Sequence, residues 1–313
     1  MKAGDGDGWV TLPDGSRRWG RFGSAGLLLH ADGREPPCAA DGGRVLMQHR
    51  ALWSHQGGTW GVPGGARDSD ESPVQAALRE FGEEVAGDTG EIELIGLHRQ
   101  EHTVWRYDTV LARTAADAPL EAANWESDEV RWVDVGEVVG LRLLPAFGRT
   151  WPLLRDALGR RLALDVDAAA VAPDGGAAEL ERLRDELAGL AAAGVAAEAL
   201  PEGLEAAGLH LWFPRVRLLV GTEAAAPEPV PGVEVARAGS GIAAGGDRLA
   251  EPGAGGGVRT QTVLVTGSDG AYGPGAQGMS AGGAQHTVPP EWLSAASSLP
   301  GAAADSVAGP SGA

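Results

Sequence analysis

Cysteine and lysine are almost absent from this chain of 313 residues, since Cys38 is its only cysteine and Lys2 its only lysine. A single cysteine allows no internal disulfide and no cysteine-cluster metal site, and it suits a reducing compartment. No segment approaches the ~18 consecutive apolar residues of a membrane span, and the first residues lack an apolar signal segment. We therefore expect a cytoplasmic protein that has no membrane partner.

Positive charge is also scarce. The 25 basic residues are outnumbered by 43 acidic residues, which gives a formal net charge of −18 at pH 7. Such a chain is not expected to bind a nucleic-acid backbone over a broad surface, so nucleic acid is an unlikely partner. An anionic ligand would instead have to be bound through metal ions or a few well-placed arginines.

The apolar patterns divide the chain into three parts. Residues 18–158 contain strand-like segments that outnumber the helical ones without regular alternation, which favours an α+β layered domain. Residues 160–272 alternate strands with a long helix, which predicts a smaller α/β unit with a parallel sheet. Residues 273–313 are rich in Gly, Ala, Ser and Pro, and we expect a flexible tail there.

One predicted helix begins at a clear start signal. Ser72, Pro73 and Gln75 have the pattern of a capping box with proline at the first helical position, which predicts a helix over residues 72–85. Its apolar residues recur at helical spacing, and this stripe is expected to pack on a sheet. The stripe consists of Val74, Leu78, Phe81 and Val85.

The same helix carries three glutamates on one face. Glu80, Glu83 and Glu84 fall within about 100° of arc, where like charges repel one another and weaken a helix. Two interpretations are open at this point. The face is either an ordinary solvated acidic surface, or a platform for a divalent cation such as Mg²⁺, which prefers hard oxygen ligands.

The spacing of the surrounding residues favours the second interpretation. Gly65, Glu71 and the segment Arg79-Glu80-Phe81-Gly82-Glu83-Glu84 resemble the Nudix box, the signature of the Nudix hydrolase superfamily. Its pattern is G-x5-E-x7-R-E-U-x-E-E-x-G-U, where U is a bulky apolar residue. The preceding "GTWGVPGG" is similar to the turn common in that family. The resemblance covers residues 18–158 and implies a Nudix α/β/α sandwich with a mixed sheet.

Two positions depart from the pattern. Ala86 stands where the family has glycine, and Gly87 stands where it has a bulky apolar residue. We expect the glycine to act one residue late, at a left-handed helix C-cap.

The resemblance implies a role for each matching residue. Glu71 would pair with Arg79 and orient the carboxylates, and Glu80 is the first candidate for general base, a role that varies among family members. Many members use one more acid from a later strand or loop, for which Glu126 is the first choice here and Glu129 the second. The implied ligands of Mg²⁺, or alternatively Mn²⁺, are Gly64 through its carbonyl, Glu80, Glu83, Glu84 and Glu126 as the first choice of later acid.

The implied substrate is a nucleoside diphosphate linked to a further group X, whose pyrophosphate linkage is attacked by water. Arg50 and Arg67 are candidate phosphate contacts. Trp105 and Tyr107 lie on the same face of a predicted strand, where they either stack on a nucleobase or pack in the core. The identity of X is left open.

The second half weakly resembles NYN domains, which share the PIN-like fold of metal-dependent ribonucleases. Asp167 follows a buried strand, with Asp247 and Asp269 as weaker candidates for further acids. Ala169 and Ala170 stand where an asparagine would be expected, so the resemblance implies a degenerate and inactive relative. The alternative is a small accessory unit or one that mediates homodimerisation.

Three classes of function follow. The first is a Mg²⁺-dependent Nudix nucleotide pyrophosphohydrolase. The second is a non-catalytic Nudix module that senses a nucleotide or contacts a partner, although such a module would not need every charged position of the box. The third is a metal-dependent ribonuclease acting through the second half, which the missing acids and the net charge disfavour.

Overall fold

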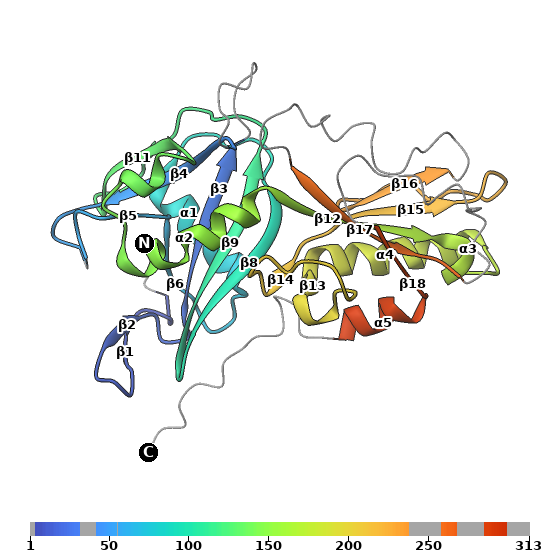
Figure 1. Ribbon diagram of the computed structural model, residues 1–313, viewed down its shortest axis with the longest axis horizontal. Helices are drawn as coiled ribbons and strands as arrows, with labels where there is room; N and C mark the ends of the chain where they lie inside the picture. The colour runs from blue at the N-terminus through green and yellow to red at the C-terminus, as the bar shows by residue number, and fades with distance from the viewer. Residues whose placement is uncertain (1–3, 32–41, 55, 238–257, 268–284, 299–313) are drawn as a thin grey trace. The chain divides into compact units, whose positions relative to one another are not determined.

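A computed structural model describes residues 4–31, 42–54, 56–237, 258–267 and 285–298 (Figure 1). The chain separates into two compact units after Leu158, and residues 207–210 belong with the first unit. Cys38 lies outside the described residues. In the described part of the chain, no helix has both the length and the hydropathy needed to cross a membrane.

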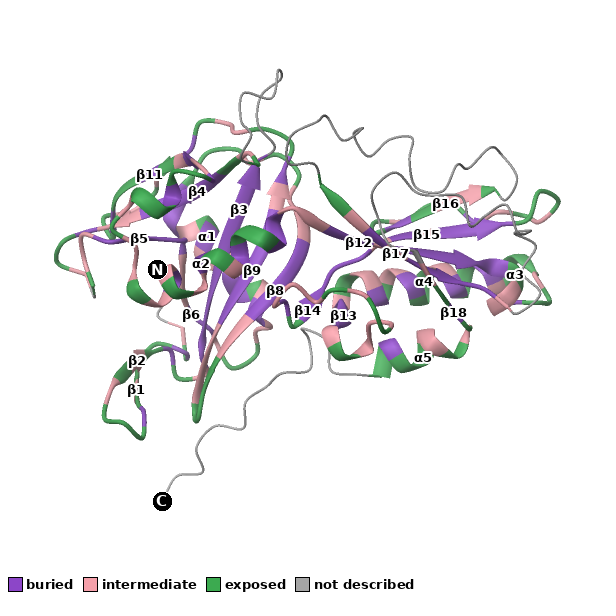
Figure 2. Ribbon diagram, viewed as in Figure 1, coloured by how far each residue is buried: buried purple, intermediate pink, exposed green. Residues whose placement is uncertain are grey.

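A mixed sheet forms the centre of the first unit. Its central pair, β3 and β9, is parallel, while the other neighbours run antiparallel. All eight residues of β3 are buried, so both faces of this strand are covered (Figure 2). The expected α+β architecture is confirmed. In sheet order the strands are β11 (Ser127–Asp134), β4 (Arg44–Arg50), β3 (Ser24–Ala31), β9 (Trp105–Thr114) and β8 (Glu93–His102).

Short elements extend this frame. The hairpin of β1 and β2 begins at Trp9, so the folded unit starts before the predicted residue 18 because these two strands pair with each other. β5 adds to β4, β6 adds to β3, and β7 pairs with β10. Their bounds are β1 Trp9–Thr11, β2 Arg17–Trp19, β5 Trp60–Gly61, β6 Gly64–Ala66, β7 Val85–Ala86, β10 Glu121–Ala122 and the 3-10 helix η1 Val138–Gly140.

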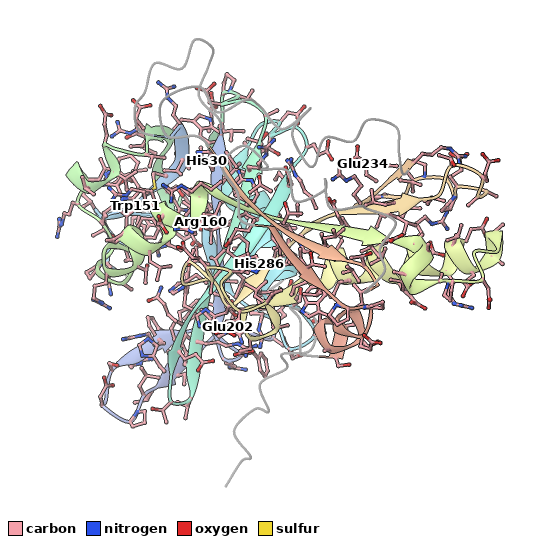
Figure 3. The ribbon with its side chains drawn as sticks, turned by 45° about the vertical axis from the view of Figure 1, so that its right-hand side comes forward. His30, Trp151, Arg160, Glu202, Glu234 and His286 are labelled. Carbon is pink, nitrogen blue, oxygen red and sulfur yellow. The ribbon has the colours of Figure 1, made fainter. Side chains whose placement is uncertain are left out.

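Two helices complete the first unit, α1 (Pro73–Glu84) and α2 (Pro145–Leu158). α1 packs against β3, β6 and β9. Trp151 of α2, labelled in Figure 3, is fully buried.

The buried face of α1 differs from the predicted stripe. Leu78 is 37% exposed and Val74 is only half-buried, whereas Ala76, Ala77 and Glu84 are buried. The two alanines allow the helix backbone to approach the sheet closely. Compared with the predicted buried face, α1 is rotated about its axis so that Glu84 points inward. The helix therefore presents part of its acidic face to the protein interior rather than to solvent.

The second unit is built on a sheet of five strands that are all parallel, as the sequence predicted. β12 lies in the middle, and Glu234 and His286, labelled in Figure 3, lie on the edge strands β16 and β18. In sheet order the strands are β16 (Val233–Arg237), β15 (Arg215–Val220), β12 (Arg160–Asp167), β17 (Arg259–Val265) and β18 (Gln285–Val288). The remaining elements are α3 (Ala168–Val171), α4 (Ala177–Ala193), β13 (Val195–Ala196), the 3-10 helix η2 (Ala197–Ala199), β14 (Leu211–Trp212) and α5 (Glu291–Ser298).

The predicted flexible tail is wrong for residues 285–298. β18 pairs with β17, and α5 is held by a hydrogen bond from Trp292 Nε1 to the carbonyl of Ala199 at 2.8 Å. Ala296 of α5 is buried. Gly and Ala dominate the composition of the segment, but a few apolar residues are enough to add a strand and a helix to an existing sheet.

Candidate active site

The helix that carries the acidic cluster starts as the sequence predicted. The Ser72 hydroxyl accepts a hydrogen bond from the Gln75 backbone N–H at 3.2 Å, and the Gln75 side chain accepts one from the Ser72 N–H at 2.8 Å. This reciprocal capping satisfies two of the free N–H groups at the helix start. It fixes where α1 begins, and hence where its last two turns place the glutamates.

Arg79 joins the loop, the glycine turn and the helix. Its Nε and Nη2 donate to the two carboxylate oxygens of Glu71 at 2.6 and 3.0 Å, which forms the predicted pair in a bidentate geometry. Nη2 also donates to the carbonyl of Ala66 at 2.8 Å, and Nη1 donates to Glu80 at 2.9 Å. A half-buried, bidentate pair of this kind is more rigid than an ordinary surface ion pair.

Glu84 lies at the bottom of the site. Its side chain is 4% exposed, and one carboxylate oxygen accepts a hydrogen bond from the Gly64 N–H at 2.8 Å. The Gln48 side chain also bonds to it, and the charges of Arg50 and Glu126 act on it. Residues from β4, the glycine turn and the segment before β11 therefore surround this one carboxylate.

Glu80 lies directly against the glycine turn. A Cβ atom at position 65 would collide with the Glu80 carboxylate, so only glycine leaves room for that side chain. Glu83 is more exposed, and its carboxylate is 3.7 Å from Arg79 Nη1. The spacing of the motif thus places Glu80 over the turn, Glu84 beneath it and Glu83 at the rim.

The two inner carboxylates hold protons tightly. Burial raises the pKa of Glu80 to about 7, with Glu84 and Glu83 adding to the rise and Arg79 opposing it. Burial likewise raises the pKa of Glu84 to about 7, with Glu126 adding to the rise and Gln48, Gly64 and Arg50 opposing it. Each carboxylate is thus close enough to another to be repelled by it.

The donor set fits a hard divalent cation. Among the described residues, no three carboxylate, imidazole or thiolate groups converge closely enough to enclose an ion. In this arrangement Arg79 is bonded to Glu80, and the Gly64 N–H is bonded to Glu84. Mg²⁺ usually takes only one or two protein carboxylates and keeps several waters. The buried amide oxygen of Gln48 also lacks a hydrogen-bond partner among the described residues, as expected where a water or a cation binds.

The two predicted later acids differ in their position. The negative charge of Glu126 raises the pKa of Glu84, so Glu126 acts electrostatically on the cluster. Glu129 lies on β11 and forms a 3.4 Å ion pair with Arg131 at the surface. This favours Glu126 over Glu129, in the order that the sequence suggested.

The two predicted phosphate contacts, Arg50 and Arg67, have different surroundings. The positive charge of Arg50 lowers the pKa of Glu84, so Arg50 acts electrostatically on the acidic cluster. Arg67 is buried, and its guanidinium donates to the carbonyls of Phe22 and Glu71. These bonds tie the loop to the strand region before β3, and they favour a packing role for Arg67 over a phosphate contact.

The aromatic residues of β9 are engaged within the protein. Trp105 Nε1 donates to the carbonyls of Trp19 and Gly20 at 3.1 and 3.0 Å, which ties β9 to the N-terminal hairpin. The Tyr107 hydroxyl lies against Gly26, and burial raises its pKa, with Glu84 adding to the rise. These contacts favour the packing interpretation for both rings over base stacking.

The exit of the motif differs from the expected C-cap. α1 ends at Glu84, and Val85 and Ala86 are extended and pair with β10. Gly87 has φ +123°, and a Cβ there would collide with Leu120. The glycine is therefore required three residues beyond the last helical residue, by a close approach of the chain to Leu120, and the predicted left-handed C-cap is wrong.

Sequence reasoning missed two polar residues of the site. Gln48 donates to Ser127 Oγ at 2.7 Å and to Glu84, and the Asn124 side chain donates to the carbonyl of Glu83 at 3.1 Å. A polar residue inside the apolar strand "RVLMQHR" is the one signal that pointed to Gln48. Asn124 has no such signal, because its partner is a backbone carbonyl distant in sequence.

The comparisons with known proteins agree with this geometry. Residues 37–156 match the NUDIX domain. Over 164 residues the chain is 48% identical to a Mycobacterium tuberculosis protein named "Putative 8-oxo-dGTP diphosphatase 3", a match that covers 49% of this chain and 71% of the relative. The chain belongs to the Nudix family.

Two further matches cover the same half of the chain. A Bifidobacterium longum protein named "Nucleoside triphosphate pyrophosphatase/Nudix hydrolase fusion protein" is 42% identical over 47% of this chain and 30% of its own length. The crystal structure of a Nudix hydrolase from M. smegmatis is 44% identical over 48% of this chain and 94% of that chain, with a TM-score of 0.43.

The raised pKa values predict how stability depends on pH. Glu80 and Glu84 have a pKa of about 7 in the folded chain against an ordinary 4.5, so the folded state binds more protons between these values. The stability they contribute is complete below about pH 4.5 and is lost as pH rises through about 7, by roughly 3 kcal/mol for each carboxylate. A bound divalent cation requires the deprotonated forms, so its stabilising effect grows over the same range.

Thermal unfolding between pH 5.5 and 8, with and without Mg²⁺, measures this linkage. We expect the melting temperature without metal to fall with pH, and the increase on adding Mg²⁺ to grow. Glu84→Gln is expected to flatten both trends. A Mg²⁺ effect of equal size at every pH would contradict the assignment of these carboxylates as ligands.

Proposed function

We propose that the first unit is a hydrolase of phosphoric anhydride bonds that cleaves the pyrophosphate linkage of a nucleoside diphosphate linked to a further group. The observation that carries the proposal is the pair of inner carboxylates, Glu80 and Glu84, held beside a glycine turn by Arg79 and the Gly64 N–H. Membership in the Nudix family and the names of relatives as diphosphatases support the same reaction class.

The residues of the cluster have separate tasks in this proposal. Mg²⁺, or Mn²⁺ in its place, would be held by the cluster ligands and would neutralise phosphate charge and acidify a water. Glu71 and Arg79 orient the cluster. Glu80, with a pKa near neutrality, is suited to accept a proton from the attacking water. The ligands proposed are the Gly64 carbonyl, Glu80, Glu83, Glu84 and Glu126.

The substrate side of the proposal is less specific. Arg50 would contact a phosphate group, and the action of its charge on Glu84 supports this part of the proposal. The group X is not assigned by any residue described above. A cytoplasmic location and a homodimer stay predictions, as does the NYN-like resemblance of the second unit, whose Asp247 and Asp269 lie outside the described residues.

A Mg²⁺-dependent phosphate-release screen over nucleotides, using the full chain, tests the proposal. Products that need a phosphatase to release phosphate are assayed with one added. We expect hydrolysis of at least one nucleotide, abolished by Glu84→Gln and retained by Asp167→Asn. Asp167 of the second unit accepts bonds from the Ala169 N–H and Thr266 Oγ, which asparagine can partly preserve. The reverse pattern would assign the activity to the second unit, and nucleotide binding without turnover would indicate a sensing module.

A further inference from the structure

Two tryptophans stack on each other at the surface beside the acidic cluster. Trp53 lies in the segment between β4 and β5, and Trp125 lies in the segment between β10 and β11. Their ring centroids are 4.4 Å apart with an interplanar angle of 30°. They are 59% and 69% exposed, and the neighbouring Leu52 is 78% exposed. Large apolar side chains gathered in this way at a surface mark a binding site more often than isolated ones do.

Hydrogen bonds tie the segments that carry these rings to the end of α1 and to each other. The segment before Trp125 is bonded to the end of α1, through the Ala123 N–H to the carbonyl of Glu84 at 2.9 Å and through Asn124 to the carbonyl of Glu83 at 3.1 Å. Trp125 itself directly precedes Glu126, whose charge acts on Glu84. The Trp125 ring is therefore one residue along the chain from a group of the cluster.

The second ring is anchored to the first segment. The Ala51 N–H donates to the carbonyl of Glu126 at 2.9 Å, and the Ser54 N–H and hydroxyl both donate to the carbonyl of Ala51. Trp53 lies in that tight turn, three residues after Arg50. Trp53 thus follows the proposed phosphate contact Arg50 in sequence, and Trp125 precedes Glu126. The two segments are bonded to each other.

We propose that the outer face of Trp125, backed by Trp53, is the stacking platform for the nucleobase of the substrate. This inference rests on the proposed nucleotide hydrolase function. It identifies the nucleobase as the part of the substrate that these rings recognise. The two rings already touch, so a base stacks on the exposed face of Trp125 rather than between them. Recognition by ring faces tolerates different bases but requires an aromatic one.

Exposure distinguishes Trp53 and Trp125 from Trp105 and Tyr107. Stacking of a base on an exposed aromatic side chain is sequence-tolerant and is lost when the ring is removed. Trp105 and Tyr107 are occupied by contacts within the protein. Trp53 and Trp125 each retain a large exposed surface, and their segments, which also carry Arg50 and Glu126, are joined by the backbone hydrogen bond from Ala51 to Glu126.

The test is calorimetric binding of a non-hydrolysable nucleoside triphosphate analogue to the full chain, with inorganic tripolyphosphate as the probe without a base. We expect Trp125→Ala to weaken analogue binding by roughly 5- to 100-fold and to leave tripolyphosphate binding unchanged. Trp125→Phe is expected to keep most of the affinity, and Trp53→Ala to lose less than Trp125→Ala. Trp9→Ala is the matched control, because Trp9 is an exposed tryptophan that contacts Trp19 in the N-terminal hairpin.

The outcomes are distinguishable from those for hydrolysis. Equal analogue affinity in Trp125→Ala and the unsubstituted chain would overturn the platform, even if turnover is confirmed. Analogue binding that depends on Trp125, without turnover of any nucleotide, would keep the platform and overturn the hydrolase. A change in sedimentation behaviour in Trp125→Ala, with analogue affinity unchanged, would assign the two rings to a contact between protein chains and would also overturn the platform.

Discussion

Glu84→Gln is expected to lower turnover of the substrate by at least two orders of magnitude, on the order of 3 kcal/mol in activation free energy. Glutamine is nearly isosteric and can still accept the hydrogen bond from the Gly64 N–H, so the fold is retained. What is lost is the negative charge that a cation and an incoming pyrophosphate require. Glu83→Gln is expected to act in the same direction at the rim of the site.

The stability of the same variant gives an independent readout. A carboxylate whose pKa is raised to about 7 by burial is destabilising when charged, so Glu84→Gln is expected to melt at an equal or higher temperature than the unsubstituted chain at pH 8 without metal. Glu91→Gln, an exposed residue outside the cluster, is the matched control. Near-normal turnover in both Glu83→Gln and Glu84→Gln would show that the metal assignment is wrong.

Arg79→Lys is expected to reduce turnover by about 10- to 100-fold although it preserves the positive charge. A lysine cannot reproduce the bidentate contact with Glu71 and at the same time reach the Ala66 carbonyl and Glu80. The expected cost in unfolding free energy is about 1–2 kcal/mol, because the loop and the helix lose their common partner.

Steady-state kinetics separate this positioning effect from a loss of binding. The fall is expected in kcat rather than in KM, and the effects of Arg79→Lys and Glu71→Gln are expected to be less than additive, because both break the same contact. Arg182→Lys, on the exposed face of α4, is the control for the exchange itself. Full turnover in Arg79→Lys would contradict the role of the pair.

The frame of the site was predictable because its signals are local. The capping box located the start of α1, and fixed spacing located Glu71, Arg79 and the glutamates, which depend on residues close in sequence. The rotation of α1 was not predictable from periodicity, because Ala76 and Ala77 pack closely where larger residues were expected to define the buried face. A hydrophobic stripe reports residue type, whereas burial also depends on how near a sheet the helix can lie.

The other residues of the site could not be predicted from the sequence, because their positions depend on contacts between segments that are distant in the chain. Gln48 and Asn124 come to the cluster from β4 and from the segment before β11. Arg67, in contrast, fitted the pattern of a phosphate contact but is bonded to Phe22. In both cases the deciding partner is a backbone or side-chain group far away in sequence, to which periodicity and spacing do not respond.

The direct passage of α1 into β7 also limits how this protein can change its sequence length. Val85 and Ala86 pair with β10, and the next residues of that segment bond to the carbonyls at the end of α1. An insertion or deletion within residues 119–126 would shift this pairing, whereas surface loops usually tolerate such changes. We expect natural variation in loop length near the site to be concentrated elsewhere, and attempts to engineer substrate range to succeed by side-chain exchange on this segment rather than by altering its length.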